Sequence, residues 1–173
     1  EGVIFDTYQW QQTMLDGSTA TFEKVVRPDT VTVLAITKTG KILICEQEQP
    51  YIGKFVSLPG GVMDGDDVEK EGERELLEET GYKSEKIVRW FESTKINKID
   101  WIVNYLVAYD CEKIVEQNLD KGGEHIVVKE IGFEDFVDLI KEGKLRDTPF
   151  MYRILQEYVK TNSFEFLKSK IYE

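Results

Sequence analysis

A run of acidic residues between positions 64 and 79 sets the strongest limit on how this chain can fold. The run holds nine Asp and Glu residues and only two basic ones, Lys70 and Arg74. Its pattern predicts a helix from Asp67 to Thr80, with acids in the first turn that suit the helix dipole. Because like charges at helical spacing repel each other, one face of this helix has to meet water or a cation.

Four glutamates would share that face, because spacings of three and four residues bring helical side chains together: Glu71, Glu75, Glu78 and Glu79. A solvated surface stripe is one interpretation of such a charge run. A cation site is the other, and two features favour it. The helix closely follows Pro59-Gly60-Gly61, a turn where backbone can approach a ligand. The helix also has few basic residues to balance its acidic face, and clustered carboxylates are the ligands that Mg²⁺ prefers.

The rest of the chain predicts an α+β fold, in which helices flank a curved mixed sheet. Apolar strand-like segments occupy most of the first half, and no regular alternation of strand and helix is present. The expected strands include 31–36, 42–46, 55–58, 86–92, 101–109 and 125–131, and the expected later helices are 133–142 and one that opens at Asp147-Thr148-Pro149.

Composition excludes several classes of function. The net charge of −11 is a poor match for a nucleic acid polymer, so we expect no such partner. No apolar run approaches the roughly 20 residues of a membrane helix, and we expect neither a signal peptide nor a membrane partner. The single histidine, His125, rules out sites that need several. Cys45 and Cys111 form no C-x-x-C pair, and we expect a reduced, cytoplasmic setting.

The segment from Gly60-Gly61 to Tyr82 resembles the Nudix box, G-x5-E-x7-R-E-U-x-E-E-x-G-U, where U is bulky and apolar. The matching residues are Arg74, Glu75, Leu76, Glu78, Glu79 and Gly81. The resemblance extends loosely over most of the chain. It implies a Nudix-like α/β/α sandwich and a hydrolase in which water attacks phosphorus in a nucleoside diphosphate linked to another moiety.

The resemblance also implies a role for each matching residue. Glu78 and Glu79 would bind the metal, Mg²⁺ or alternatively Mn²⁺, and Glu75 would bind metal or assist the water. Arg74 would orient a glutamate. A carbonyl of Gly60 or Gly61 would add a ligand.

Two departures from the pattern concern the start of the box. Asp66 stands in place of the first glutamate, where it would brace the helix start. Counted from Gly61, the loop before Asp66 is one residue shorter than is usual in the family. This shorter loop would affect the position of the backbone carbonyl ligand more than the positions of the glutamates. At the other end of the box, Gly81 should end the helix.

A further acid often comes from a loop well after the box in this family. Glu124, in Asp120-Lys121-Gly122-Gly123-Glu124, is our candidate for the general base or an extra metal ligand. A solvated loop acid is the alternative.

The N-terminal residues 1–28 resemble the strand extension of the ADP-ribose-hydrolysing branch, packed on a hydrolase domain at 29–173. That branch often dimerises, so we expect a homodimer through these strands. Tyr8 and Trp10 are candidates to stack on a base, although dimer packing is an alternative use. Arg27 and Lys54 are candidate phosphate contacts, with salt bridges as the alternative.

The expected substrate is a small nucleotide, with ADP-ribose first among the nucleoside diphosphate sugars. Gln49 stands near where that branch often has a basic residue, which weakens the case for ADP-ribose. A nucleoside triphosphate pyrophosphatase and a Nudix-fold nucleotide-binding module without catalysis remain alternatives.

Overall fold

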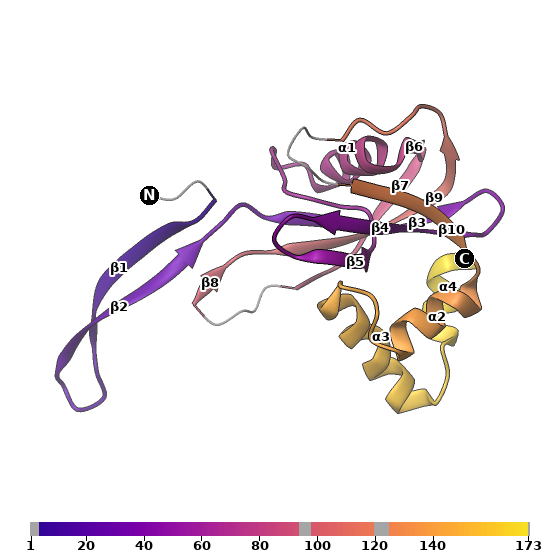
Figure 1. Cartoon of the computed structure of the whole chain (residues 1–173). Helices are drawn as coiled ribbons and strands as arrows, with labels where there is room; N and C mark the ends of the chain where they lie inside the picture. Colours follow the sequence, from indigo (N-terminus) through magenta and orange to yellow (C-terminus); the bar gives the residue numbers. More distant parts are fainter. Residues whose placement is uncertain (1–3, 94–97, 120–124, 173) are drawn as a thin grey trace.

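A computed structural model describes residues 4–93, 98–119 and 125–172. Its main body has three layers, with helix α1 (Val68–Thr80) on one face of a sheet and three helices on the other (Figure 1). Those three are α2 (Phe133–Lys141), α3 (Thr148–Thr161) and α4 (Glu165–Tyr172). None of the described helices is long and apolar enough to cross a membrane. The predicted α+β sandwich is confirmed.

The central sheet is mixed and has seven strands. Its main path runs β10-β4-β3-β9-β6, while β5 pairs with β4 and β7 with β9. Strands β3 and β9 run parallel, and the other pairs of this sheet are antiparallel. The strand bounds are β3 (Thr30–Thr37), β4 (Ile42–Gln49), β5 (Gly53–Ser57), β6 (Tyr82–Lys83), β7 (Lys86–Ser93), β9 (Val103–Lys113) and β10 (His125–Ile131).

Strand β3 explains why both faces of the sheet are covered. Successive side chains of a strand point to opposite faces, and β3 is apolar on both. Val31, Val33 and Ala35 pack in the cluster with Leu76 of α1. Leu34 and Ile36 belong instead to the cluster that includes Phe136, Phe150 and Ile154 of the C-terminal helices. The chain therefore needs helices on both sides to keep this strand from water.

Helix α1 begins and ends where the sequence predicts. The Asp67 side chain caps its start by accepting from the Lys70 amide at 3.3 Å. Gly81 ends it at φ 75°, and its amide donates to the Leu77 carbonyl. The segment after β9 then satisfies the next free carbonyls. The Asn118 amide donates to the Glu78 carbonyl at 2.9 Å, and the Gln117 side chain donates to the Glu79 carbonyl.

The N-terminal strands form a second, smaller sheet that extends away from the main body (Figure 1). Strands β1 (Asp6–Thr13) and β2 (Thr19–Val26) make an antiparallel hairpin around a turn at Asp16-Gly17. Strand β2 also pairs in parallel with β8 (Ile99–Asp100), a short strand that the sequence pattern did not predict. Every residue of β1 is exposed.

Gly72 supplies a stability test of the contact between α1 and the sheet. A Cβ on Gly72 would lie 2.2 Å from Cδ1 of Leu106, which is fully buried in β9. We expect Gly72→Ala to lower the free energy of unfolding, because overpacking costs about 1–3 kcal/mol against about 1 kcal/mol gained in helix propensity. Urea denaturation measures the change. The exposed neighbour Glu73→Ala is the control, and a Gly72→Ala protein as stable as wild type would contradict the packing contact.

Candidate functional site

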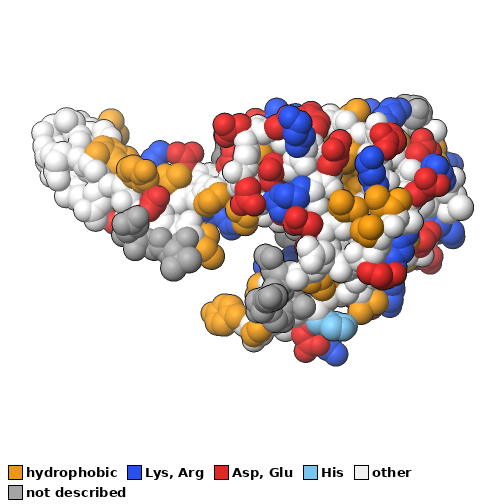
Figure 2. Space-filling model, turned by 90° about the horizontal axis from the view of Figure 1, so that it is seen from above, with side chains coloured by type: hydrophobic (Ala, Val, Ile, Leu, Met, Phe, Trp, Pro, Cys, Tyr) orange, Lys and Arg blue, Asp and Glu red, His pale blue; other side chains and the backbone are white. Residues whose placement is uncertain are grey.

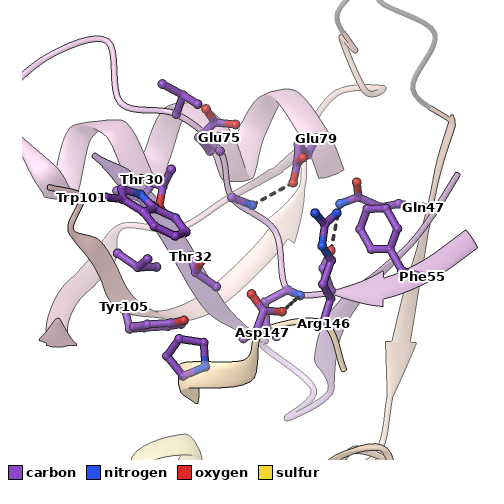
Figure 3. A pocket seen from close by; sticks show the side chains of 18 of the residues that line it. Thr30, Thr32, Gln47, Phe55, Glu75, Glu79, Trp101, Tyr105, Arg146 and Asp147 are labelled. Carbon is purple, nitrogen blue, oxygen red and sulfur yellow. Dashed lines mark hydrogen bonds between the residues drawn. The ribbon is translucent and has the colours of Figure 1, made fainter. Parts of the chain in front are cut away.

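A cavity of about 620 Å³ lies where the glycine turn, α1, the sheet and the start of α3 meet. Figure 3 shows its two walls. Glu75 and Glu79 of α1 lie on one side, while Phe55, Arg146 and Asp147 lie on the other, with Trp101 and Tyr105 completing the enclosure. Its volume falls within the range of small-molecule sites, roughly 300–1,000 Å³. The predicted site residues that line it are Arg27, Gly60, Gly61, Arg74, Glu75 and Glu79.

Arg74 holds the acidic face of α1 together. Its guanidinium donates to Glu71 at 2.8 and 3.1 Å, to Glu75 at 2.8 Å and to Glu78 at 2.8 Å. It also donates to the Val62 carbonyl of the loop at 2.8 Å. One cation therefore fixes the rotamers of three glutamates, which is the geometry expected of a residue that orients them.

Glu75 is the most buried of these glutamates, with a relative exposure of 8%. Burial raises the pKa of its carboxyl, and the charge and hydrogen bond of Arg74 oppose that shift. Gly61 lies directly against it, since a Cβ there would lie 2.6 Å from Glu75 Oε1. Any side chain at position 61 would push this carboxylate aside, so a glycine is needed on steric grounds.

The backbone of the glycine turn favours one carbonyl over its neighbours as a ligand. The carbonyls of Pro59 and Gly61 already accept from the Val33 and Val31 amides of β3. The Gly60 amide donates in the other direction, to Glu79 Oε2 at 2.8 Å (Figure 3). Among the described residues, no backbone amide donates to the Gly60 carbonyl, which makes it the carbonyl of this turn best able to accept a ligand. A Cβ on Gly60 would lie 2.2 Å from the Val31 carbonyl, so no larger residue fits.

The carboxylates are directed toward protein partners in this structure. Within residues 4–93, 98–119 and 125–172, no group of three or more acidic, His or Cys side chains is arranged to hold a metal ion. Glu75 and Glu78 bond to Arg74, and Glu79 bonds to the Gly60 amide. The carboxylates of Glu75, Glu78 and Glu79 and a backbone carbonyl of the glycine turn are nevertheless oxygen ligands of the kind that Mg²⁺ prefers.

Two cation–aromatic pairs stand at the edge of the cavity. The Arg27 guanidinium lies 4.5 Å from the Trp101 ring centre, and its Nε is buried without a hydrogen-bond partner. Burial lowers the pKa of Arg27. The Arg146 guanidinium lies 4.3 Å from the Phe55 ring centre. Both arginines are thus held by stacking, which leaves their N–H groups able to bind an anion or a polar ligand.

Asp147 forms part of the wall opposite the glutamates and precedes the first turn of α3. Its Oδ2 accepts from the Leu58 amide at 2.8 Å (Figure 3). Burial raises the pKa of Asp147 to about 6, and the Leu58 amide offsets only part of that shift. A carboxyl that titrates close to neutral pH therefore lines the cavity.

The remaining predicted residues lie elsewhere. Lys54 lines a neighbouring pocket with His125 and Lys144, and its ammonium lies 3.9 Å from Glu48. Tyr8 and Trp10 are exposed on β1. Asp66 is exposed and lines a shallow pocket with Asp29. Glu124 falls outside the described residues. The structure thus brings six of the predicted residues to the cavity, adds Glu78 through Arg74, and places Lys54, Tyr8, Trp10 and Asp66 away from it.

Comparison with known proteins gives a family and a fold. The model of the NUDIX domain matches residues 26–157. The chain belongs to the Nudix family.

Relatives and solved structures agree with this assignment. The chain is 30% identical to the ADP-ribose pyrophosphatase of Bacillus subtilis (strain 168), over 88% of this chain and 84% of the relative. It is 33% identical to the methanol dehydrogenase activator of Bacillus methanolicus, over 84% and 82%. The crystal structure of an ADP compounds hydrolase shares the fold, with a TM-score of 0.72 and 16% identity over 95% of this chain and 91% of the other.

The predicted Nudix hydrolase acting on phosphorus anhydride bonds is therefore confirmed. Sequence reasoning missed two contributors to the site of this hydrolase. Glu71, recognised only as part of the acidic face, accepts from the Asp64 amide at 3.0 Å and so fixes the loop that precedes α1. Asp147 was read only as a helix start. For Glu71 the helical spacing from Arg74 was an available signal, whereas for Asp147 only the tertiary fold supplies one.

The raised pKa of Asp147 makes the stability of this Nudix domain depend on pH. The folded chain holds the proton up to a pKa of about 6, against an ordinary value of 3.8. Asp147 therefore contributes stability that is present below the ordinary value and is lost as pH rises through about 6. Relative to Asp147→Asn, wild type should lose free energy of unfolding as pH rises from about 3.8 to about 6.

Urea denaturation of both proteins at several pH values measures that difference. Asp138→Asn on the exposed surface of α2 is the matched control, because no burial acts on its carboxyl. A difference between wild type and Asp147→Asn that does not change with pH would contradict the burial of this carboxyl.

Proposed function

We propose that this Nudix hydrolase cleaves the diphosphate of a nucleoside diphosphate sugar, with ADP-ribose as the leading substrate. The observation that carries the proposal is the cavity with two unlike walls. Carboxylates and a backbone carbonyl on one side suit a metal-bound diphosphate, while aromatic, amide and hydroxyl groups on the other suit a base or a sugar. The similarity to the ADP-ribose pyrophosphatase of Bacillus subtilis supports the same substrate class.

In this proposal the catalytic ion is Mg²⁺, with Mn²⁺ as an alternative, held by Glu75, Glu78, Glu79 and the Gly60 carbonyl. When bound, it would polarise the phosphoryl oxygens and lower the pKa of a bound water. Arg74 would keep Glu75 and Glu78 oriented. The Gly61 carbonyl is less suited, since it already accepts from β3.

Other residues of the chain would hold the substrate and activate the water. Arg27 would contact a phosphate oxygen, supported by its unpartnered Nε at the cavity edge. Glu124 would act as general base or as an extra ligand, and this role remains a prediction from sequence. Lys54 would reach a substrate only if the substrate extended past Phe55, which lines both pockets. Asp66 would brace the start of α1.

The test is product analysis on a panel of ADP-ribose, other sugar nucleotides, dinucleotides and triphosphates, with Mg²⁺, Mn²⁺ or chelator. We expect metal-dependent release of a nucleoside monophosphate from one sugar nucleotide. Preferential cleavage of triphosphates would favour the alternative of a nucleoside triphosphate pyrophosphatase. No turnover by a folded protein, together with equal ligand affinity with and without metal, would favour the binding module.

Glu79→Gln tests the metal assignment. The Gln oxygen can still accept from the Gly60 amide, so the fold should persist while a charged ligand is lost. We expect turnover to fall by about a hundredfold or more, because the metal contributes several kcal/mol to transition-state stabilisation. Glu73→Gln, exposed on the same helix, is the control. Unchanged turnover in Glu79→Gln would overturn the assignment of this ligand.

We further propose that residues 1–28 form an extension that mediates a homodimer, on a hydrolase domain at 29–173. Exposed apolar side chains on this extension support the idea, among them Ile4, Phe5, Tyr8 and Trp10. Figure 2 shows hydrophobic side chains along the extended part of the molecule. Tyr8 and Trp10 would then serve the dimer contact. The separate, buried thiols of Cys45 and Cys111 are consistent with a reducing, cytoplasmic setting.

Trp10→Glu tests the dimer, because a charge placed in a buried apolar contact is costly. Sedimentation velocity should give the mass of two chains for wild type and of one chain for this variant. Gln11→Glu lies on the opposite face of β1 and should leave the mass unchanged. A wild-type protein that sediments as one chain at all concentrations tested would contradict the proposal.

A further inference from the structure

Asp147 presents one carboxylate oxygen to the cavity while the other is held by the backbone. Oδ2 accepts from the Leu58 amide, which anchors the side chain just before the glycine turn. In Figure 3 the carboxylate lies between Tyr105 and the turn, with Thr32 above it. Asp147 makes no side-chain hydrogen bond to the start of its own helix. The remaining oxygen is therefore available to a ligand.

No basic side chain within the described part of the chain forms a salt bridge with Asp147. Its neighbour Arg146 stacks on Phe55 instead. The Arg146 amide donates to the Val56 carbonyl at 2.7 Å, so the backbone on both sides of the turn is fixed. The charge of Arg146 and the Leu58 amide offset only part of the effect of burial on Asp147, whose pKa stays raised. A ligand that donates a hydrogen bond to this carboxylate would offset more of the cost of burying its charge.

Besides the charge of its neighbour Arg146, uncharged polar groups lie on the Asp147 side of the cavity. Thr32, Gln47, Ser57 and Tyr105 line the same cavity. Gln47 donates to Ser57 at 2.8 Å, which fixes its amide. A carboxylate among hydroxyls and amides accepts from a hydroxyl or an amino group. It repels a phosphate group, since two anions at contact distance in a partly dry site cost several kcal/mol.

We propose that Asp147 determines specificity by accepting a hydrogen bond from a hydroxyl or amino group of the substrate moiety that lies opposite the glutamates, and by rejecting a moiety that carries a further phosphate there. The inference rests on the proposed function, because it names which part of a nucleoside diphosphate sugar this wall recognises. Asp147 would contact the substrate without taking part in the attack on phosphorus.

Asp147→Asn is the decisive variant. Its side-chain oxygen can still accept from the Leu58 amide, while its amino group would face the cavity as a donor. Three substrates separate the sources of the donor. ADP-ribose carries both sugar hydroxyls and the adenine amine, inosine diphosphate ribose lacks that amine, and ADP-ribose 1″-phosphate carries an extra anion on the sugar.

We expect Asp147→Asn to raise KM for ADP-ribose by about 10- to 100-fold, the size of one charge-assisted hydrogen bond, with kcat changed by less than about threefold. Wild type should prefer ADP-ribose to its 1″-phosphate, and the variant should lose that preference. If the donor is a sugar hydroxyl, wild type treats inosine diphosphate ribose like ADP-ribose. If the donor is the adenine amine, wild type binds inosine diphosphate ribose more weakly than ADP-ribose, whereas Asp147→Asn binds the two equally.

Calorimetric binding of ADP-ribose in the presence of chelator gives a second readout that needs no turnover. The dissociation constant should rise about tenfold or more in Asp147→Asn and stay unchanged in the exposed control Asp138→Asn. Equal losses on all three substrates, or unchanged ADP-ribose affinity, would overturn the inference. If wild type binds ADP-ribose with this dependence on Asp147 but does not cleave it when metal is present, the proposed function is contradicted and the inference about Asp147 is not.

Discussion

Arg74 is the contact on which the rest of the site depends. Four acidic side chains at helical spacing would repel one another, and a helix that carried them alone would turn them toward water. The guanidinium instead binds three of them and the Val62 carbonyl of the preceding loop. Because its fork of donors is rigid, it sets the directions of the carboxylates as well as compensating their charge.

The layers of the domain position this helix against the substrate cavity. Strand β3 is buried on both faces, so it joins the α1 layer to the layer of α2, α3 and α4. The glycine turn lies between these layers and is held from both sides. Val31 and Val33 fix its carbonyls, Glu79 accepts one of its amides, and Asp147 accepts the amide of Leu58 before it.

Local chemistry in the sequence was enough to predict the acidic helix α1. Asp67 caps it and Gly81 ends it, because both act within a few residues of themselves. The fold class likewise follows from strand patterns that need no partner to be recognised. Asp147 could not be placed in this way, because it meets Leu58 across 89 positions of sequence. Lys54 shows the opposite case, since it was a candidate phosphate contact in the sequence, while the structure places it on β5 in the lining of the neighbouring pocket.

The two unlike walls of the cavity come from separate parts of the chain. Glu75, Glu79 and the glycine turn belong to one compact stretch of sequence, whereas Phe55 and Arg146 belong to a strand and a loop on the far side. Among the described residues, Phe55 and Arg146 take no part in the hydrogen bonds of the Arg74 guanidinium, so substitutions of these two leave those bonds in place. During evolution, substitutions at the wall that holds Phe55 and Arg146 can therefore change which substrate is bound while the acidic face of α1 stays the same.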